Sequence, residues 1–349
     1  MVDWRLPYRS TWRVYRVARD TWADSDEVLG VTEASVERSC DGDAPLLERG
    51  SMSVDMDPQN EFAEGYCRIV MIADQDGERE RVEVATLLLS STEDDIDYGV
   101  SDVSLVGRSV LWPASKSYMS PGSYAPNGAD GAEWAARILA PAINAPVTWD
   151  GGFTLDQHYV FGDSTTVLSA VWTVLKAGNH TMQIAGDGTV SILPMPTEPD
   201  LDLGWANARL LHTEIHRERD MSEIPNRYFA IEGSQSASAI NDDPTSPTST
   251  VSRGWFSDVL DRNPKRVNGE TLDNYCARML EESSTVWDTR QYEREWWPGV
   301  TTDSIVRGTL ASVGMEGDMR VVSQGITCGV GLTVEETVRA EVRTWQRPE

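Results

Sequence analysis

Apolar and polar residues alternate along much of this chain, and the alternation predicts a protein built mainly from β-strands. Residues 11–22 set apolar side chains between arginines with a period of two, as in a strand with one buried face. Two apolar runs, 66–75 and 78–91, flank Asp76-Gly77, a dipeptide that favours a β-hairpin turn. Residues 1–110 therefore predict a domain of five or six antiparallel strands, either a small barrel or a sandwich.

The hydrophobic period changes to that of helices after Trp112-Pro113. The segment GAEWAARIL has a helical apolar face that we expect Pro141 to end. A second helix is predicted after a cap at Asp163 or Ser164, with Gly178 as its C-terminal cap. Alternating residues around the Gly186-Asp187-Gly188 turn then predict a hairpin. These elements give residues 111–200 the pattern of a mixed α/β domain.

Residues 201–349 return to strand patterns and predict a second β-domain. Its last strand is expected within Gly331–Trp345, and one helix is expected at Thr271–Ser283. Residues 234–253 are rich in Ser, Thr and Pro, and we expect a mobile loop too polar to pack. The predicted fold class is α+β and mainly β: a β-domain, a mixed α/β insert and a second β-domain.

The charge balance limits the classes of partner. The chain has 30 basic and 56 acidic residues, a formal net charge of -26, so it repels phosphate backbones and does not suit sequence-specific nucleic-acid binding. Such a charge suits the wall of a conduit through which DNA slides, and equally suits solubility or a salt-adapted host. No run approaches the roughly 18 apolar residues of a membrane span, and the N-terminus lacks the apolar core of a secretory signal. We therefore expect no stable membrane insertion.

No motif in the sequence predicts a metal or cofactor site. The four cysteines lie far apart without CxxC spacing, and we expect buried free thiols. His212 and His216 could share one face of a helix, but Thr213 occupies the position where the zinc-protease motif has Glu. The segment suits a strand equally well, which would separate the two imidazoles. No metal and no cofactor are predicted.

No catalytic motif is present either. The GxSxG, P-loop and GxGxxG patterns are absent, and acidic pairs such as Asp94-Asp95 or Glu335-Glu336 are expected by chance in so acidic a chain. We predict that the protein is not an enzyme. An alternative of another class is a carbohydrate- or receptor-binding β-protein that uses exposed tryptophans. In that alternative the aromatic side chains lining a sugar groove would be Trp112, Trp149, Trp296 and Trp297.

Three passages resemble the hub proteins of bacteriophage tail tips, a group that includes the N-terminal region of siphophage tail-associated proteins and the hubs of contractile tails. They are VSDVSLVGRSVLWPAS (100–115), the helix and hairpin of 164–196, and IPNRYFAIEG (224–233) with the C-terminal strands that follow. The resemblance implies two tube-protein-like antiparallel β-barrels, at 1–110 and 201–349, on either side of the mixed domain.

The resemblance also implies an assembly. Three copies would form a homotrimeric ring that adapts the sixfold tail tube to a threefold tip and closes the DNA channel until infection. The implied partners are the distal tail protein ring, the tape-measure protein and central fibre or spike subunits, in the tail tip of a virion made in the host cytoplasm. Because the chain ends at Glu349, piercing or digesting activities are expected on separate subunits. The hub of a contractile tail or injection machine is the alternative within this class.

Subunit contacts are expected where aromatic residues and strands concentrate, because interfaces are rich in aromatic side chains. The residues predicted to be structural or interfacial are Trp112, Trp296, Trp297, Val334 and Val338.

Overall fold

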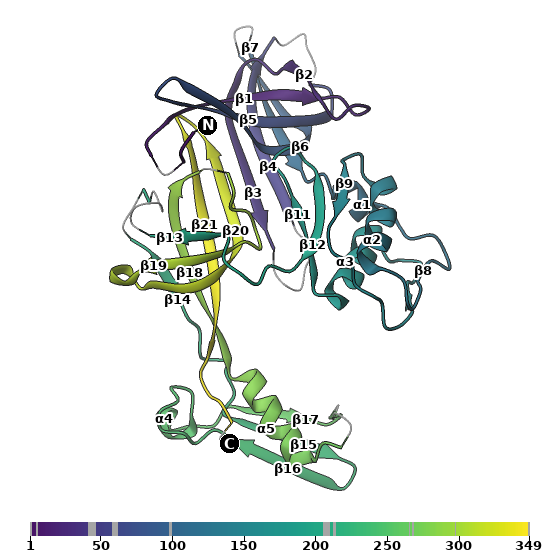
Figure 1. Ribbon diagram of the computed structural model, residues 1–349, viewed down its shortest axis with the longest axis vertical. Coiled ribbons are helices and arrows are strands. Elements are labelled where there is room, and N and C mark those ends of the chain that lie inside the picture. The colour runs from purple at the N-terminus through teal and green to yellow at the C-terminus, as the bar shows by residue number, and fades with distance from the viewer. Residues whose placement is uncertain are drawn as a thin grey trace. The chain divides into compact units, whose positions relative to one another are not determined.

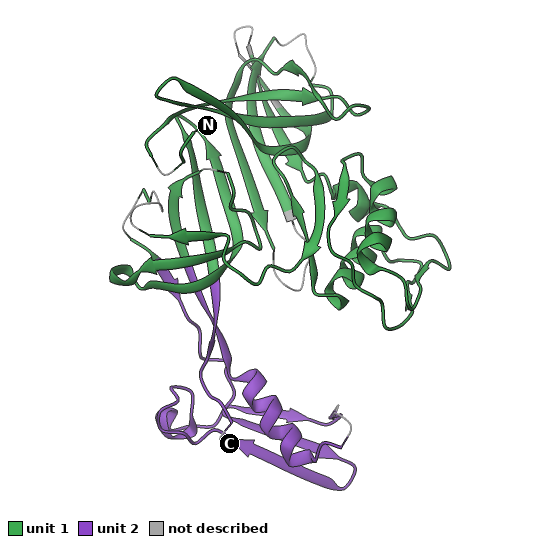
Figure 2. Ribbon diagram, in the orientation of Figure 1, with its two compact units in different colours: residues 1–215, 291–338 green, residues 216–290, 339–349 purple. Residues whose placement is uncertain are grey.

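The computed structural model describes residues 2–4, 6–40, 47–57, 62–97, 100–204, 210–211, 214–264, 266, 269–296 and 298–347. The described residues form a 13-stranded sheet, three smaller sheets and several short helices, so the protein is mainly β as predicted (Figure 1). The chain divides into two compact units (Figure 2). Unit 1 contains residues 1–215 and 291–338, and unit 2 contains residues 216–290 and 339–349.

Seven antiparallel strands precede the helices of unit 1. They are β1 (Arg9–Val17), β2 (Asp24–Glu27), β3 (Val31–Ser39), β4 (Leu47–Met56), β5 (Gly65–Gln75), β6 (Glu78–Asp97) and β7 (Val100–Arg108). The predicted hairpin at Asp76-Gly77 is confirmed: it joins β5 to β6, and both residues have the positive φ that the turn requires (51° and 87°). The nearly unbroken apolar run of β5 is buried on both faces.

A helical insert follows β7. It contains α1 (Trp112–Lys116), β8 (Tyr124–Ala125), α2 (Gly131–Leu139), the 3-10 turn Ala140–Ala142, β9 (Val147–Trp149), β10 (Tyr159–Val160), α3 (Val167–Ala177), β11 (His180–Ile184) and β12 (Val190–Pro194). Helix α2 begins where Asp130 accepts hydrogen bonds from two backbone amides, and it ends before Pro141 as predicted. Helix α3 is capped by Thr166, so the predicted cap at Asp163 or Ser164 is wrong by two to three residues.

The tip of the β11–β12 hairpin packs against the first strands. The Trp22 indole and the Arg68 guanidinium each donate to the carbonyl of Asp187 at 2.8 Å, and the Thr86 hydroxyl donates to the carbonyl of Gly186 at 2.9 Å. A Cβ at Gly186 would lie 1.9 Å from the carbonyl oxygen of Glu83. The predicted glycine turn therefore also allows a close approach of two backbones.

Replacing Gly186 by alanine is expected to lower the free energy of unfolding by about 1–3 kcal/mol, because the hairpin tip must move away from Glu83. Urea unfolding followed by tryptophan fluorescence would measure the change. Gly329→Ala is the matched control, since a Cβ there meets no atom within 4 Å. Equal losses in the two variants would contradict the proposed packing.

The remaining strands of unit 1 complete the large sheet. They are β13 (Leu201–Leu203), β18 (Thr285–Glu295), β19 (Ile305–Leu310), β20 (Met315–Cys328) and β21 (Leu332–Arg343), with a 3-10 turn at Ala311–Val313, and β18 and β21 continue into unit 2. Strand β20 pairs antiparallel with β3 from Ser323↔Ser39 to Cys328↔Ala34.

This pairing makes one continuous sheet in the order β14-β18-β21-β20-β3-β4-β7-β6-β5-β1-β2, in which the edge strand β14 is His216–Glu218. The sheet formed by the described strands is open, so the two closed barrels stay a prediction. The three predicted domains also differ from the two compact units, because the β3–β20 pairing joins the N-terminal strands to the strands near the C-terminus.

Unit 2 consists of a small sheet with one long helix. Its elements are β14 (His216–Glu218), β15 (Arg227–Glu232), β16 (Gln235–Ile240), α4 (Thr250–Arg253), β17 (Asp258–Asp261) and α5 (Leu272–Ser283), together with the ends of β18 and β21. Helix α5 matches the prediction, with Thr271 as its N-cap. Strands β16, β15 and β17 form the small sheet, and its apolar core includes Tyr228, Tyr275 and Trp345.

The prediction that residues 234–253 form a loop too polar to pack is wrong. Residues 235–240 are strand β16, and residues 250–253 are helix α4. Asn241, Thr248 and Ser249 are fully buried, and the amide of Asn241 donates to the Ser246 hydroxyl at 2.9 Å. Polar side chains can therefore form a packed segment here because they satisfy one another's hydrogen bonds.

Candidate functional site

One face of the large sheet in unit 1 is polar and exposed over many strands. The alternation of strands β18, β21, β20, β3, β4, β7 and β6 brings short Ser, Thr and acidic side chains to the same side. The carboxylates on this face are Glu33, Glu37, Asp55, Glu93, Asp95, Asp102, Glu293 and Glu335. Exposed guanidiniums among the described residues of that face include Arg49 and Arg108. The face is therefore strongly acidic and has few large apolar side chains.

The opposite face carries a row of buried polar groups across the same strands. Arg294 binds Glu336 with two hydrogen bonds of 2.9 and 2.6 Å, and both side chains are fully buried. The Gln324 amide donates to Glu336 at 2.7 Å, and Gln324 is the register partner of Arg38. Arg38 in turn donates to Glu48 at 2.8 Å. These buried polar groups therefore lie on both sides of the β20–β3 junction, where Gln324 and Arg38 are register partners.

Burial and pairing act in opposite directions on the two carboxylates of the row. Burial alone would raise the pKa of Glu336, but Arg294 and Gln324 outweigh it and hold that pKa below its ordinary value. Burial raises the pKa of Glu48 despite the attraction of Arg38. Arg294 is thus the group that keeps Glu336 charged in the core.

A buried carboxylate joins three distant parts of unit 1. Asp303 accepts hydrogen bonds from the Thr181 hydroxyl at 2.6 Å and from the Cys40 thiol at 3.2 Å. Thr181 belongs to the insert, Cys40 follows β3, and Asp303 precedes β19. These bonds hold the insert against both sets of strands. All four cysteines are free and buried, as predicted.

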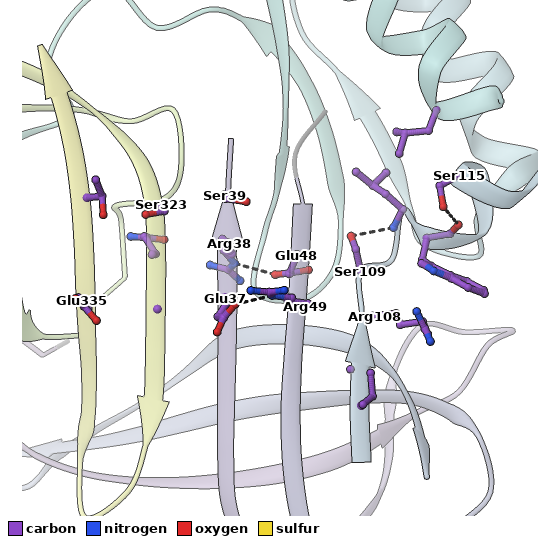
Figure 3. A pocket seen from close by; sticks show the side chains of 18 of the residues that line it. Glu37, Arg38, Ser39, Glu48, Arg49, Arg108, Ser109, Ser115, Ser323 and Glu335 are labelled. Carbon is purple, nitrogen blue, oxygen red and sulfur yellow. Dashed lines mark hydrogen bonds and ion pairs between the residues drawn. The ribbon is translucent and has the colours of Figure 1, made fainter. Parts of the chain in front are cut away.

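A groove of about 700 Å³ opens on the polar face where the strands meet the insert. Figure 3 shows Glu335 on β21 and Arg108 at the end of β7, with β20, β3 and β4 between them. Glu37 and Arg49 form an ion pair of 2.5 Å along the groove. Small residues form much of its floor, and Leu111, Trp112 and Leu168 of the insert line one side.

The insert side of the groove carries two cations around one indole. The Arg108 guanidinium lies 4.7 Å and the Lys116 ammonium 5.3 Å from the ring centroid of Trp112. Both cationic residues are exposed, and no ion pair of the described residues involves either of them. The sequence identified Trp112 only as an aromatic residue. The structure shows that the charged groups of Arg108 and Lys116 lie beside its ring.

The other predicted interface residues occupy different places. Trp296, Val334 and Val338 are buried in the chain's own core, with exposed fractions of 4%, 0% and 0%. Trp297 lies outside the described residues. The structure gives Trp296, Val334 and Val338 a packing role. Contact of the predicted interface residues with another subunit stays a prediction.

Of the tryptophans named for the carbohydrate-binding alternative, the three that the structure describes do not lie together. Trp149 is exposed on β9 of the insert, Trp112 lies at the groove and Trp296 is buried. Glu335 is exposed and Glu336 is buried on the opposite face, so these neighbours cannot act as a catalytic pair. His216 is exposed on β14, and His212 lies outside the described residues. In the part of the chain that the structure describes, no group of three or more potential ligands is placed to hold a metal ion.

Unit 2 contains a buried ionic cluster beside its junction with unit 1 in the sequence. Asp288, 1% exposed, accepts two hydrogen bonds from Arg217 at 2.8 Å, one from Arg219 at 2.7 Å and one from Arg290 at 2.8 Å. Burial alone would raise the pKa of Asp288, but these three arginines hold it well below its ordinary value.

Unit 2 also exposes apolar side chains on the face of its sheet that lies opposite helix α5. Ile231, Ile240 and Leu260 are 37%, 46% and 50% exposed, and Phe256 lies nearby with its ring 4.0 Å from the Arg227 guanidinium. None of the helices in the described part of the chain is long and apolar enough to span a membrane.

Solved structures of tail proteins have a fold similar to that of this chain. The structure is similar to the 43 kDa tail protein of prophage MuSo2 from Shewanella oneidensis, with a TM-score of 0.62 and 13% identity over 95% of this chain and 98% of that one. It is similarly close to a tail protein from Neisseria meningitidis MC58, with a TM-score of 0.61 and 14% identity over 95% and 97% of the two chains. The chain has the fold of phage tail proteins.

A third similar structure comes from the Francisella PdpA–VgrG complex. Its TM-score is 0.56 at 8% identity, and the match covers 98% of this chain but 59% of the Francisella one. No protein-family model and no curated protein matches the sequence. The similarity thus lies in the fold, and identities this low leave function to be argued from the molecule itself.

Proposed function

We propose that this protein is a structural subunit of a phage tail: a trimeric hub at the distal end that surrounds the DNA channel. The acidic face of the large sheet carries the proposal, because its composition suits a channel wall. Its Ser and Thr side chains are short, and its carboxylates repel phosphate, so DNA could pass without binding. The fold shared with phage tail proteins supports the same role.

The pairing of β20 with β3 supports the trimer. It places two sets of strands, one from each end of the chain, in a single sheet within one subunit. Three subunits would then present six such sets around a ring, which matches a sixfold tail tube to a threefold tip. Tube-like barrels would be completed when strand edges meet in the ring, because closure leaves no edge unpaired.

The proposed neighbours follow from this position. A distal tail protein ring would lie on one side of the hub, and central fibre or spike subunits on the other, with the tape-measure protein ending at the channel. The hub would keep the channel closed until infection. Similarity to a chain of the Francisella PdpA–VgrG complex supports the hub of a contractile tail or injection machine as a second candidate.

The proposal predicts a trimer of the 38.7 kDa chain. Light scattering coupled to size exclusion would measure the mass, and electron microscopy of the intact particle would detect a ring that forms only with its neighbours. In that ring, the sheet face with Glu37 and Glu335 should line the opening. A chain that stays monomeric and forms no ring in the particle would refute the trimer, and a basic channel lining would refute the role of the acidic face.

A further inference from the structure

The floor of the groove beside Trp112 has room for a ligand backbone. It contains Ser39 and Ser323, which are register partners on β3 and β20, and Gly325 two residues further along β20, all with small or absent side chains. A Cβ built at Gly325 would meet no atom within 4 Å, so open space lies directly above this position. The groove is formed within one chain, and an inference about it does not depend on the proposed ring.

Some of the cationic side chains in the groove form ion pairs with carboxylates, and others do not. Arg49 is paired with Glu37, and Arg38 is paired with Glu48. Arg108 and Lys116 lie at Trp112, and neither takes part in an ion pair among the residues that the structure describes. The chain as a whole has a formal net charge of -26, so two cations beside one indole differ in sign from most of its charged residues. They form a local positive site with an apolar wall.

We propose that this groove binds an acidic peptide segment of a partner protein. A Glu or Asp side chain of the peptide would accept hydrogen bonds from Arg108 and Lys116, while a neighbouring Leu or Phe would pack against Trp112 and Leu168. Glu335 at the opposite end of the groove repels a second carboxylate, and this fixes the direction of the peptide. Charge complementarity at the insert end and repulsion at the other thus give one preferred orientation.

A nucleic acid fits this groove less well. A phosphate backbone is charged along its whole length, so it would meet Glu37 and Glu335 as well as the two cations. A peptide can place its carboxylate at one end only. The groove therefore selects a ligand that combines a localised negative charge with an apolar side chain.

The test uses the full chain and short fluorescein-labelled peptides that carry Glu beside Leu or Phe, with binding measured by fluorescence polarisation. We expect binding by the Glu peptides, and affinity lower by about tenfold or more for the same peptides with Gln or Lys in place of Glu. Substituting Arg108→Gln and Lys116→Gln together should weaken binding of the Glu peptides by a similar factor and leave the Gln peptides unaffected.

A groove-filling variant provides an independent test. Gly325→Leu should abolish peptide binding, while Gly329→Leu, also at an open position but outside the groove, should leave it unchanged. Unfolding temperatures identify any variant that fails to fold. Equal affinity for Glu and Lys peptides, no binding of any Glu peptide, or full binding by Gly325→Leu would overturn the proposal. Preferential binding of a labelled oligonucleotide would replace it with a nucleic-acid site.

Discussion

Replacing Arg294 by methionine is expected to lower the free energy of unfolding by about 3–5 kcal/mol, the cost of leaving one partner of a buried ion pair alone. Glu336 would remain in the core without the two hydrogen bonds that Arg294 donates, and both side chains are fully buried in the native protein. The Gln324 amide can compensate only in part, because it gives Glu336 a single bond.

Urea unfolding of the full chain would measure this loss, and two further variants identify its cause. Arg307→Met removes a bidentate pair with Asp318 that is about half exposed, and its cost should stay within roughly 1 kcal/mol. The double variant Arg294→Met with Glu336→Leu removes both charges and should recover much of the lost stability. A double variant as unstable as Arg294→Met would show that the guanidinium acts through packing and not through its charge.

Asp288→Asn is the second large effect, with an expected loss of about 2–4 kcal/mol in the stability of unit 2. The substitution removes the carboxylate that three arginines share. We place the loss below that of a fully buried pair, because the Arg217 and Arg219 side chains are 45% and 28% exposed and water can solvate them in the variant. Asp258→Asn is the control, since its pair with Arg227 is exposed in the same unit.

The dependence on pH separates a charge effect from a packing effect. The pKa of Asp288 is lowered in the folded protein, so the unfolded chain binds a proton more readily. The stability that Asp288 contributes is therefore fully present well above its unfolded pKa near 3.8, and it is lost as the pH falls through that value towards the folded pKa. Hydrogen exchange of unit 2 at several pH values should show a steep acid loss in the native protein and a shallower one in Asp288→Asn. Parallel pH profiles would contradict this assignment.

Local patterns in the sequence predicted many elements correctly. The Asp76-Gly77 turn, the end of α2 at Pro141 and the span of α5 depend on neighbouring residues, so the sequence determines them directly. The cap of α3 was misplaced because Asp163, Ser164 and Thr166 all have side chains that can cap a helix. Only the tertiary packing of the insert determines which of these side chains becomes the N-cap of α3.

The groove could be predicted only in part. Trp112 is conspicuous in the sequence, but its cations come from Arg108 at the end of β7 and from Lys116 one helical turn later. Glu335 and Gly325 reach the same groove through the pairing of β20 with β3. No local pattern marks a pairing between residues separated by almost the length of the chain.

The sequence by itself determined the mainly β character, the short-range turns and helix ends, the buried free cysteines and the acidic balance. All of these follow from local periodicity, turn chemistry or composition. The tertiary structure alone decided that β20 continues the sheet of β3, that Asn241 and Thr248 are buried, and that Arg294 faces Glu336 in the core. The physical reason is that a buried polar group is stable only beside a partner that satisfies it, and the fold brings these partners together from distant parts of the chain.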